Sequence, residues 1–137
     1  NVPLADYDDI TQKERKKLNF DNKNFDEKIA YFPDGYRKKK GDPISPRALK
    51  HINELKAIKQ ETPDIRCVLC FIIPRNDITQ FKINQDDEIY LKAVQDAWMV
   101  GVEIIGVCIK WTKNKAKFVR DDIPILLYQN YGPQNII

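Results

Sequence analysis

Apolar residues recur at helical spacing in residues 45–60 and predict an amphipathic helix there. Ser45 is a favourable N-cap, and Pro46 suits the first helical position, where the missing amide hydrogen has no partner to lose. The predicted inward stripe consists of Ala48, Ile52, Leu55 and the stem of Lys59.

Two further segments, residues 65–73 and 102–110, are almost continuously apolar and rich in β-branched residues. Because neither alternates between apolar and polar positions, both are predicted to be strands covered on both faces, as in a parallel sheet. A second helix is expected between them at residues 86–100, since acidic residues gather at its start and Gly101 follows its end. Its inward stripe is expected to comprise Ile89 or Tyr90, Ala93, Ala97 and Val100.

The order helix, strand, helix, strand predicts an α/β domain with a mixed sheet and a right-handed crossover. A turn at residues 113–115 should let residues 116–120 pair back antiparallel, and residues 123–128 form a last extended segment. A short apolar segment also stands at residues 29–33. Two long strands cannot cover two helices, so we expect at least one more strand before residue 1.

The two ends of the chain differ from this core. Residues 6–28 are charged and rich in asparagine, which predicts an exposed segment with a helical turn near residues 11–18. The chain begins Asn-Val-Pro-Leu-Ala, without a methionine or a signal-peptide pattern. We therefore expect the sequence to start within a longer protein, and we expect a loose tail from Gly132 onward.

Composition indicates a globular protein, because 42% of the residues are hydrophobic, 31% are charged and the net charge is +3. These values exclude a wholly disordered chain and a collagen-like fibre. The longest apolar run, residues 67–73, is far shorter than the ~20 residues that cross a bilayer, so no membrane partner is expected. The positive charge is compatible with a nucleic-acid partner without requiring one.

Three cysteines lie in apolar surroundings, and their odd number argues against a secreted disulfide framework. We expect an intracellular protein whose thiols are reduced and buried. Cys67 and Cys70 match a C-x-x-C motif, but residues three apart in a strand point to opposite faces. Only Cys108 and His51 could complete a zinc site, so the sequence predicts no metal centre or redox pair.

The candidate binding residues are basic and surround the start of the first predicted helix. They comprise a loop run and part of the helix's outer arc: Arg37, Lys38, Lys39, Lys40, Arg47, Lys50 and His51. They form either a surface that grips phosphate or a solvated helix face with a charged loop, and composition favours neither. Asp34, in an Asp-Gly pair, is interpreted as a turn former. Trp98 and Trp111 are expected to pack in the core or hairpin, because they do not alternate with basic residues as in single-strand binders.

The order of these motifs resembles the C-terminal, nuclease-like domain of the sugar fermentation stimulation protein (SfsA) family. Residues 32–35, Phe-Pro-Asp-Gly, resemble the family's F-P-D-A, and residues 45–55 resemble its T-x-R-G-x-K-H-L-x-E-L. Later matches are Arg75, Asp77 and Phe81, residues 101–104 and residues 123–126. The resemblance covers about residues 29–128, while the basic run at residues 37–40 departs from the family's pattern as an insertion.

The resemblance implies a restriction-endonuclease-like fold, in which carboxylates hold Mg²⁺ beside a lysine. The family's Asp and Glu-x-Lys would lie upstream of Asn1, as would its OB-like domain. The resemblance also implies that Arg47 and Lys50 contact phosphate. His51 would then hydrogen-bond phosphate or position a water, and Asp34 would support the metal site or hold its loop.

We therefore expect a partial SfsA-like domain over residues 1–137, with its core at residues 29–128 and a tail at residues 129–137. The complete protein would bind nucleic acid, with DNA as the partner and Mg²⁺ as the cofactor of a nuclease fold. This chain should cleave nothing, because no carboxylate pair with a lysine remains at the required spacing. The alternatives are a non-catalytic binding or regulatory module of the same fold, or an RNA-associated component of a larger assembly. The oligomeric state stays open.

Overall fold

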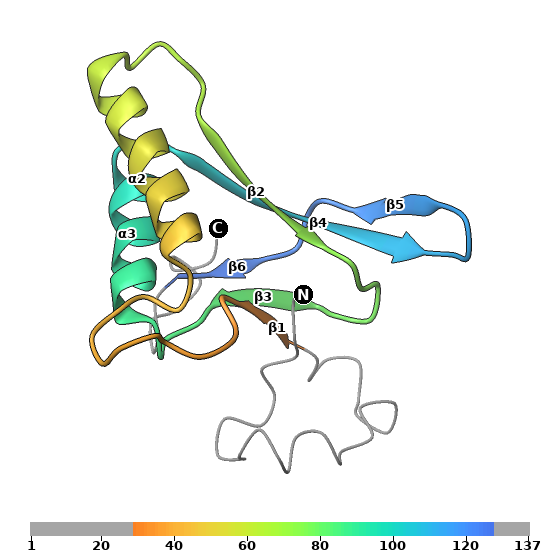
Figure 1. Ribbon diagram of the computed structural model, residues 1–137. Helices are drawn as coiled ribbons and strands as arrows, with labels where there is room; N and C mark the ends of the chain where they lie inside the picture. Colours follow the sequence, from red (N-terminus) through yellow and green to blue (C-terminus); the bar gives the residue numbers. More distant parts are fainter. Residues whose placement is uncertain (1–28, 128–137) are drawn as a thin grey trace.

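Two helices and six strands make up residues 29–127, the part of the chain that the computed structural model describes (Figure 1). In chain order they are β1 (Ile29–Phe32), α2 (Pro46–Glu61), β2 (Val68–Ile73), β3 (Gln80–Ile83), α3 (Glu88–Met99), β4 (Glu103–Trp111), β5 (Ala116–Arg120) and β6 (Ile125–Leu126). The strands form two sheets, in the orders β1-β3-β6 and β2-β4-β5. The predicted α/β class is confirmed, and strand directions are mixed in the second sheet only.

The first sheet is parallel throughout, with β3 between β1 and β6. Phe81 lies in register with Ala30 on one side and Ile125 on the other, and all three side chains are buried. The sequence does not predict β3, because its alternation lasts only four residues and follows a turn-like segment. The short apolar segments at either end of the predicted core become the edge strands of this sheet.

The second sheet has the predicted pairings, since β2 and β4 run parallel and β5 returns antiparallel to β4. The expectation that β2 and β4 are covered on both faces is wrong. Ile73 is fully buried, whereas its neighbour Ile72 is 54% exposed and Ile105 of β4 is 38% exposed. One face of this sheet therefore packs on the core, and within residues 29–127 the other face is open.

Both helices begin and end close to the predicted residues. The Ser45 hydroxyl accepts a hydrogen bond from the Ala48 amide at 3.2 Å and caps α2. The Asp87 carboxylate caps α3 by accepting from the Tyr90 amide at 3.0 Å. Gly101 follows α3 with a φ of 104°, a left-handed conformation that glycine adopts without a Cβ clash.

The two helices lie side by side (Figure 1), and their buried residues belong to one core cluster with the buried residues of the strands. Ile52 is the buried residue of the predicted stripe on α2. On α3 the buried residues are Tyr90, Val94 and Ala97, so Tyr90 is the correct choice of the two predicted alternatives. Ile89 is 42% exposed.

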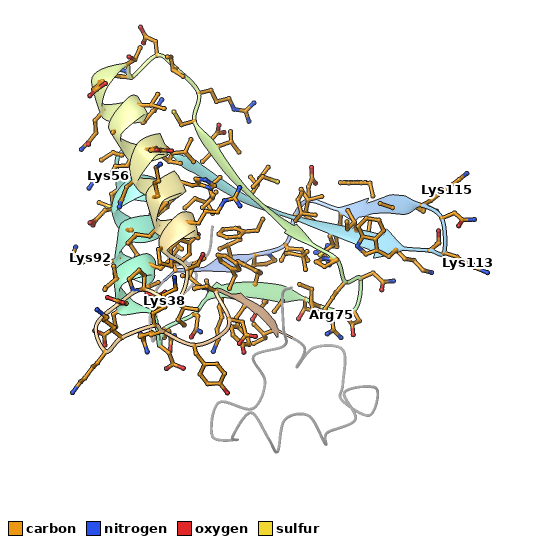
Figure 2. All side chains as sticks on the ribbon, viewed as in Figure 1. Lys38, Lys56, Arg75, Lys92, Lys113 and Lys115 are labelled. Atoms are coloured by element: carbon orange, nitrogen blue, oxygen red, sulfur yellow. The ribbon has the colours of Figure 1, made fainter. Side chains whose placement is uncertain are left out.

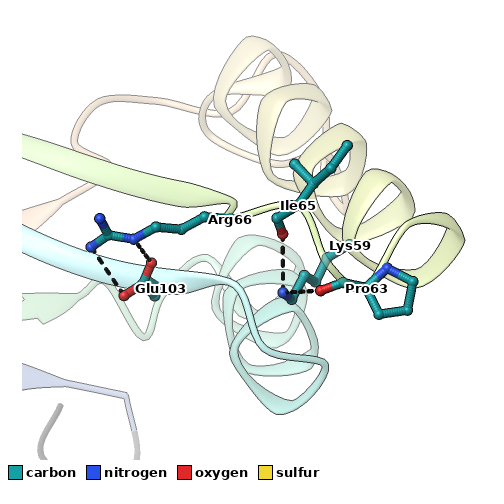
Figure 3. A network of polar contacts seen from close by, with 5 residues as sticks. All are labelled: Lys59, Pro63, Ile65, Arg66 and Glu103. Atoms are coloured by element: carbon teal, nitrogen blue, oxygen red, sulfur yellow. Dashed lines mark hydrogen bonds and ion pairs between the residues drawn. The ribbon is translucent and has the colours of Figure 1, made fainter.

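Polar contacts fix the path from α2 into the second sheet (Figure 3). The Lys59 ammonium donates hydrogen bonds to the carbonyl oxygens of Pro63, at 2.6 Å, and of Ile65, at 3.0 Å. The Arg66 guanidinium then donates to both oxygens of the Glu103 carboxylate, at the start of β4. These contacts tie the end of α2 to the beginning of the parallel strand pair.

An aromatic cluster joins both sheets to α3. The ring centroid of Phe71 in β2 lies 4.7 Å from that of Phe81 in β3 and 5.7 Å from that of Phe32 in β1. Phe32 also meets Tyr90 of α3 edge-on at 5.7 Å. Aromatic pairs at such distances contribute stability beyond that of their buried area, so this cluster stabilises the contact between the two sheets and α3.

The predicted helical turn near residues 11–18 and the predicted tail from Gly132 lie outside the described residues. Residue 128, the last of the predicted extended segment, also lies outside them. Within residues 29–127, neither helix has the length and apolar composition that crossing a membrane requires.

Candidate nucleic-acid interface

Six of the predicted basic residues lie on the surface around the start of α2 and are called here the basic helix surface. They are Arg37, Lys38, Lys39, Lys40, Arg47 and Lys50, and each is exposed. Figure 2 shows Lys38 on the loop beside the first turns of the helices. The first turn of α2 contains no acidic residue, so the positive end of its dipole is not neutralised from within the helix.

Hydrogen bonds to the start of α3 hold the loop that carries the basic run. Asp87, only 1% exposed, accepts from the Ile44 amide at 2.7 Å while it caps α3 at Tyr90. At the other end of the loop, the Asn84 side chain donates to the carbonyl oxygen of Pro33 at 2.8 Å. The segment between Pro33 and Ile44 is therefore fastened at both ends to one helix terminus.

Acidic residues interrupt the basic helix surface. Lys50 forms an ion pair with Glu54 at 3.8 Å, and both side chains are largely exposed. Arg37 and Lys40 line a hollow of about 340 Å³ whose other polar walls are acidic: Asp42, Asp86, Asp87 and Glu88. The structure thus brings Arg37 and Lys40 together at this hollow, while Arg47 and Lys50 lie on α2 outside its lining.

The two predicted accessory residues have separate surroundings. The exposed Asp34 accepts a hydrogen bond from the Tyr31 hydroxyl at 2.9 Å, which supports a role in holding the loop. His51 is exposed on α2, next to Lys50, and its side chain makes no hydrogen bond or ion pair with residues 29–127. No hydrogen bond or ion pair within that range joins Asp34 to His51.

The cysteines are divided between the core and the surface. Cys67 and Cys108 are buried, as predicted, but the expectation for Cys70 is wrong, because it lies exposed on β2. Loss of solvation raises the pKa of the Cys70 and Cys108 thiols, so neither has the stabilised thiolate of a reactive cysteine. No group of three His, Cys, Asp or Glu side chains within residues 29–127 could hold a metal ion.

A second basic surface lies on the hairpin of β4 and β5, and sequence reasoning missed it. Residues 110–119, called here the arm, are all exposed. Trp111 is 61% exposed and Phe118 is 59% exposed, so the expectation that Trp111 packs in the core or hairpin is wrong; Trp98 does pack against the core. A charge count could have found the arm, because it holds four lysines and no acidic residue occurs between Glu103 and Asp121.

Comparisons with known proteins agree with the fold. The family model described as "Sugar fermentation stimulation protein RE domain" matches residues 9–115. A similar solved structure is that of SfsA from Pyrococcus furiosus in complex with Ca²⁺, with 19% sequence identity and a TM-score of 0.56. That match covers 71% of this chain and 38% of the other chain, so the matched part spans well under half the length of that protein. At this identity the match shows a shared fold alone. A search of curated proteins found no match.

Proposed function

This chain belongs to the sugar fermentation stimulation protein family, and from that premise we propose that it binds DNA through the basic helix surface. The observation that carries the proposal is the exposure of six basic side chains around one helix start, four of them on a loop fastened by the buried Asp87 and two on α2. A fastened loop presents its charges at low entropic cost, because the backbone is already ordered before the partner arrives.

The chemistry of these side chains fits a phosphate backbone. The Arg47 guanidinium offers a planar set of donors that matches two phosphate oxygens, and the lysines act as point charges. The amides of the first turn of α2 add donors at the positive end of its dipole. Such contacts bind without reading base sequence, so we expect binding that depends strongly on salt and weakly on sequence.

The Ca²⁺ in the Pyrococcus furiosus protein supports a divalent-cation site in the longer proteins of the family. We propose Mg²⁺-dependent cleavage for such a longer protein only. Residues 29–127 do not fit a metal site, because they contain no group of three potential ligands, and we derive no catalytic step for them. From the sequence, which has no carboxylate pair with a lysine at the required strand spacing, we still expect the 137-residue chain to leave a DNA duplex intact in the presence of Mg²⁺, as gel electrophoresis would show.

Fluorescence anisotropy of a labelled duplex of about 30 base pairs tests the binding proposal. The double substitution Arg47→Gln, Lys50→Gln should weaken binding about tenfold and lower the slope of log affinity against log salt by about 1.8, or 0.9 for each phosphate contact. The matched control is Lys56→Gln, Lys92→Gln, which removes two charges that pair with Asp96 elsewhere on the helices.

Two outcomes would contradict the proposal. Absence of duplex binding at low salt would reject it outright. Equal weakening by the test and control pairs would reject the assignment to the basic helix surface, because net charge alone would then explain the loss. The same titration with an RNA duplex tests the choice of DNA, which tighter binding to RNA would overturn.

A further inference from the structure

The arm extends from the second sheet, away from the helices, as Figure 1 shows. In Figure 2, Lys113 and Lys115 lie at its tip, at the opposite end of the molecule from Lys38, Lys56 and Lys92 on the helical side. The arm is therefore a surface separate from the basic helix surface, and the proposed DNA contacts there do not involve it.

The pairing of β4 with β5 gives the arm two different faces. Trp111 lies opposite Ala116 and Ile109 lies opposite Phe118, which makes the two aromatic residues diagonal neighbours on one face. Lys110 and Lys117 lie opposite each other, so their side chains belong to the other face. The arm thus presents two exposed rings on one face and lysines on its reverse and at its tip.

The tip is a closed two-residue turn. The Thr112 amide donates to the Lys115 carbonyl oxygen at 2.8 Å, and the Thr112 hydroxyl donates to the same oxygen at 3.1 Å. At the base of the arm, the Arg120 guanidinium donates to the Asp122 carboxylate at 2.6 Å. The arm is therefore a preformed element, which reduces the ordering that a partner must supply.

The charges of the arm are not neutralised within the described part of the chain. No carboxylate of residues 29–127 forms an ion pair with Lys110, Lys113, Lys115 or Lys117. The cores of protein–protein interfaces are depleted in lysine, and exposed rings among unpaired lysines are therefore unusual as a protein-docking surface. Aromatic rings beside positive charge are the combination that binds single-stranded nucleic acid, where bases stack and phosphates pair.

We propose that the arm binds single-stranded nucleic acid, with bases stacked on Trp111 and Phe118 and phosphates held by Lys113 and Lys115. The proposal rests on the proposed function and extends it from the duplex to an adjoining unpaired strand. A single strand fits better than a duplex because a stacking ring needs the open face of a base, which a duplex conceals.

Fluorescence of Trp111 provides a direct test. The substitution Trp98→Phe leaves Trp111 as the only tryptophan of the 137-residue chain. Titration with an oligothymidylate of about 12 nucleotides should quench its emission, because a stacked base quenches an indole. An equal titration with a duplex of the same length should quench much less. Equal quenching by both would overturn the preference for single strands.

Substitutions identify the contacts. Trp111→Ala and Phe118→Ala should each weaken oligothymidylate binding about tenfold, within the range for loss of one stacked base, whereas Trp111→Phe should retain most of the affinity. Lys113→Gln with Lys115→Gln should lower the single-strand salt slope by about 1.4, or 0.7 for each contact. Ile72→Ala is the matched control, because it removes an exposed apolar side chain from the same sheet without removing a ring.

The outcomes separate this inference from the proposed function. Arm variants that bind single strands like the wild type would overturn the inference, even if Arg47→Gln, Lys50→Gln still weakens duplex binding. If the wild type does not bind duplex DNA, while the arm variants still lose affinity for single strands, the proposed function alone is rejected. If Ile72→Ala weakens oligothymidylate binding as much as Trp111→Ala, general loss of apolar surface and not loss of a stacking ring explains the effect, which also overturns the inference. Circular dichroism of every variant must match the wild type for these comparisons to count.

Discussion

The two sheets of this molecule are built from similar residues and differ in what covers them. In the parallel sheet, Phe81 of the central strand is fully buried; in the mixed sheet, Phe118 of the edge strand is 59% exposed. Within β2 itself, Ile73 is fully buried and Ile72 is 54% exposed. The apolar content of a strand therefore does not determine how many of its faces pack against the core.

The open face has a physical consequence for function. Side chains of the mixed sheet that point inward meet the aromatic cluster, while those that point outward end in Trp111 and Phe118 on the arm. Exposed apolar groups cost nothing structurally when they stay scattered, but rings beside lysines form a surface with a chemical preference. The comparison therefore separates residues that hold the fold from residues that are free to bind.

The greatest loss of stability is expected when the buried Phe81 is truncated, and the exposed Phe118 provides the comparison. Phe81→Ala should lower the free energy of unfolding by about 3–5 kcal/mol, because it removes a buried ring and leaves a cavity. Phe118→Ala should change it by no more than about 0.5 kcal/mol, because the ring is mostly in solvent. Urea unfolding followed by circular dichroism measures both values. Similar losses for the two variants would show that Phe118 is packed and would abolish the contrast between the sheets.

A smaller loss of stability is expected when Asp87, which fastens the loop that carries the basic run, is replaced. Asp87→Ala should lower the free energy of unfolding by about 2–3 kcal/mol, because it removes a helix cap and takes the acceptor from the buried Tyr90 amide and the partly buried Ile44 amide. Asp86→Ala is the control, since that neighbouring side chain is exposed. Duplex binding should weaken in Asp87→Ala while quenching of Trp111 by oligothymidylate is unchanged. If both binding activities fall together, the two surfaces are not independent.

The parts of this fold that the sequence predicts are those that depend on neighbouring residues along the chain. The Ser45–Pro46 start and the Gly101 end follow from backbone hydrogen bonding near each helix terminus, so the sequence alone locates both helices. The pairing of β2 with β4 follows from the crossover rule. By contrast, a continuous apolar run looks the same whether one face or both are covered, and this ambiguity produced the wrong prediction for Ile72 and Cys70.

The residues of the candidate sites also divide into those that the sequence predicted and those that it did not. Spacing along one helix predicts the exposure of Arg47 and Lys50, because helical periodicity is local. The arm could not be recognised from spacing, because the exposure of Trp111 depends on which other strands cover the sheet. Only a count of its lysines, which no nearby acidic residue opposes in the sequence, could have pointed to it.

Substitution of a buried and of an exposed cysteine should also change stability differently, by a smaller amount. Cys108→Ser should lower the free energy of unfolding by about 1–2 kcal/mol, because it places a hydroxyl in an apolar site. Cys70→Ser, on the open face, should stay within about 0.5 kcal/mol of the wild type. Labelling with a maleimide should modify one thiol in the folded protein and three after denaturation. Rapid modification of two or more thiols in the folded protein would contradict the assignment of Cys67 and Cys108 to the core.

The smallest effect concerns the ion pair where the mixed sheet begins. The Arg66 guanidinium donates to the Glu103 carboxylate and lowers the pKa of Glu103 below its ordinary value of about 4.3. Because the folded-state pKa is the lower one, the pair stabilises the fold above the unfolded-state pKa, and this contribution is lost as the pH falls through the folded-state pKa. Glu103→Gln should therefore flatten the decline of the urea midpoint as the pH falls below the ordinary glutamate pKa, and only slightly, since both side chains are exposed to screening solvent. Glu61→Gln, which removes an exposed carboxylate at the end of α2, should keep the wild-type dependence. An unchanged pH dependence in Glu103→Gln would mean that the mixed sheet gains no stability from this ion pair.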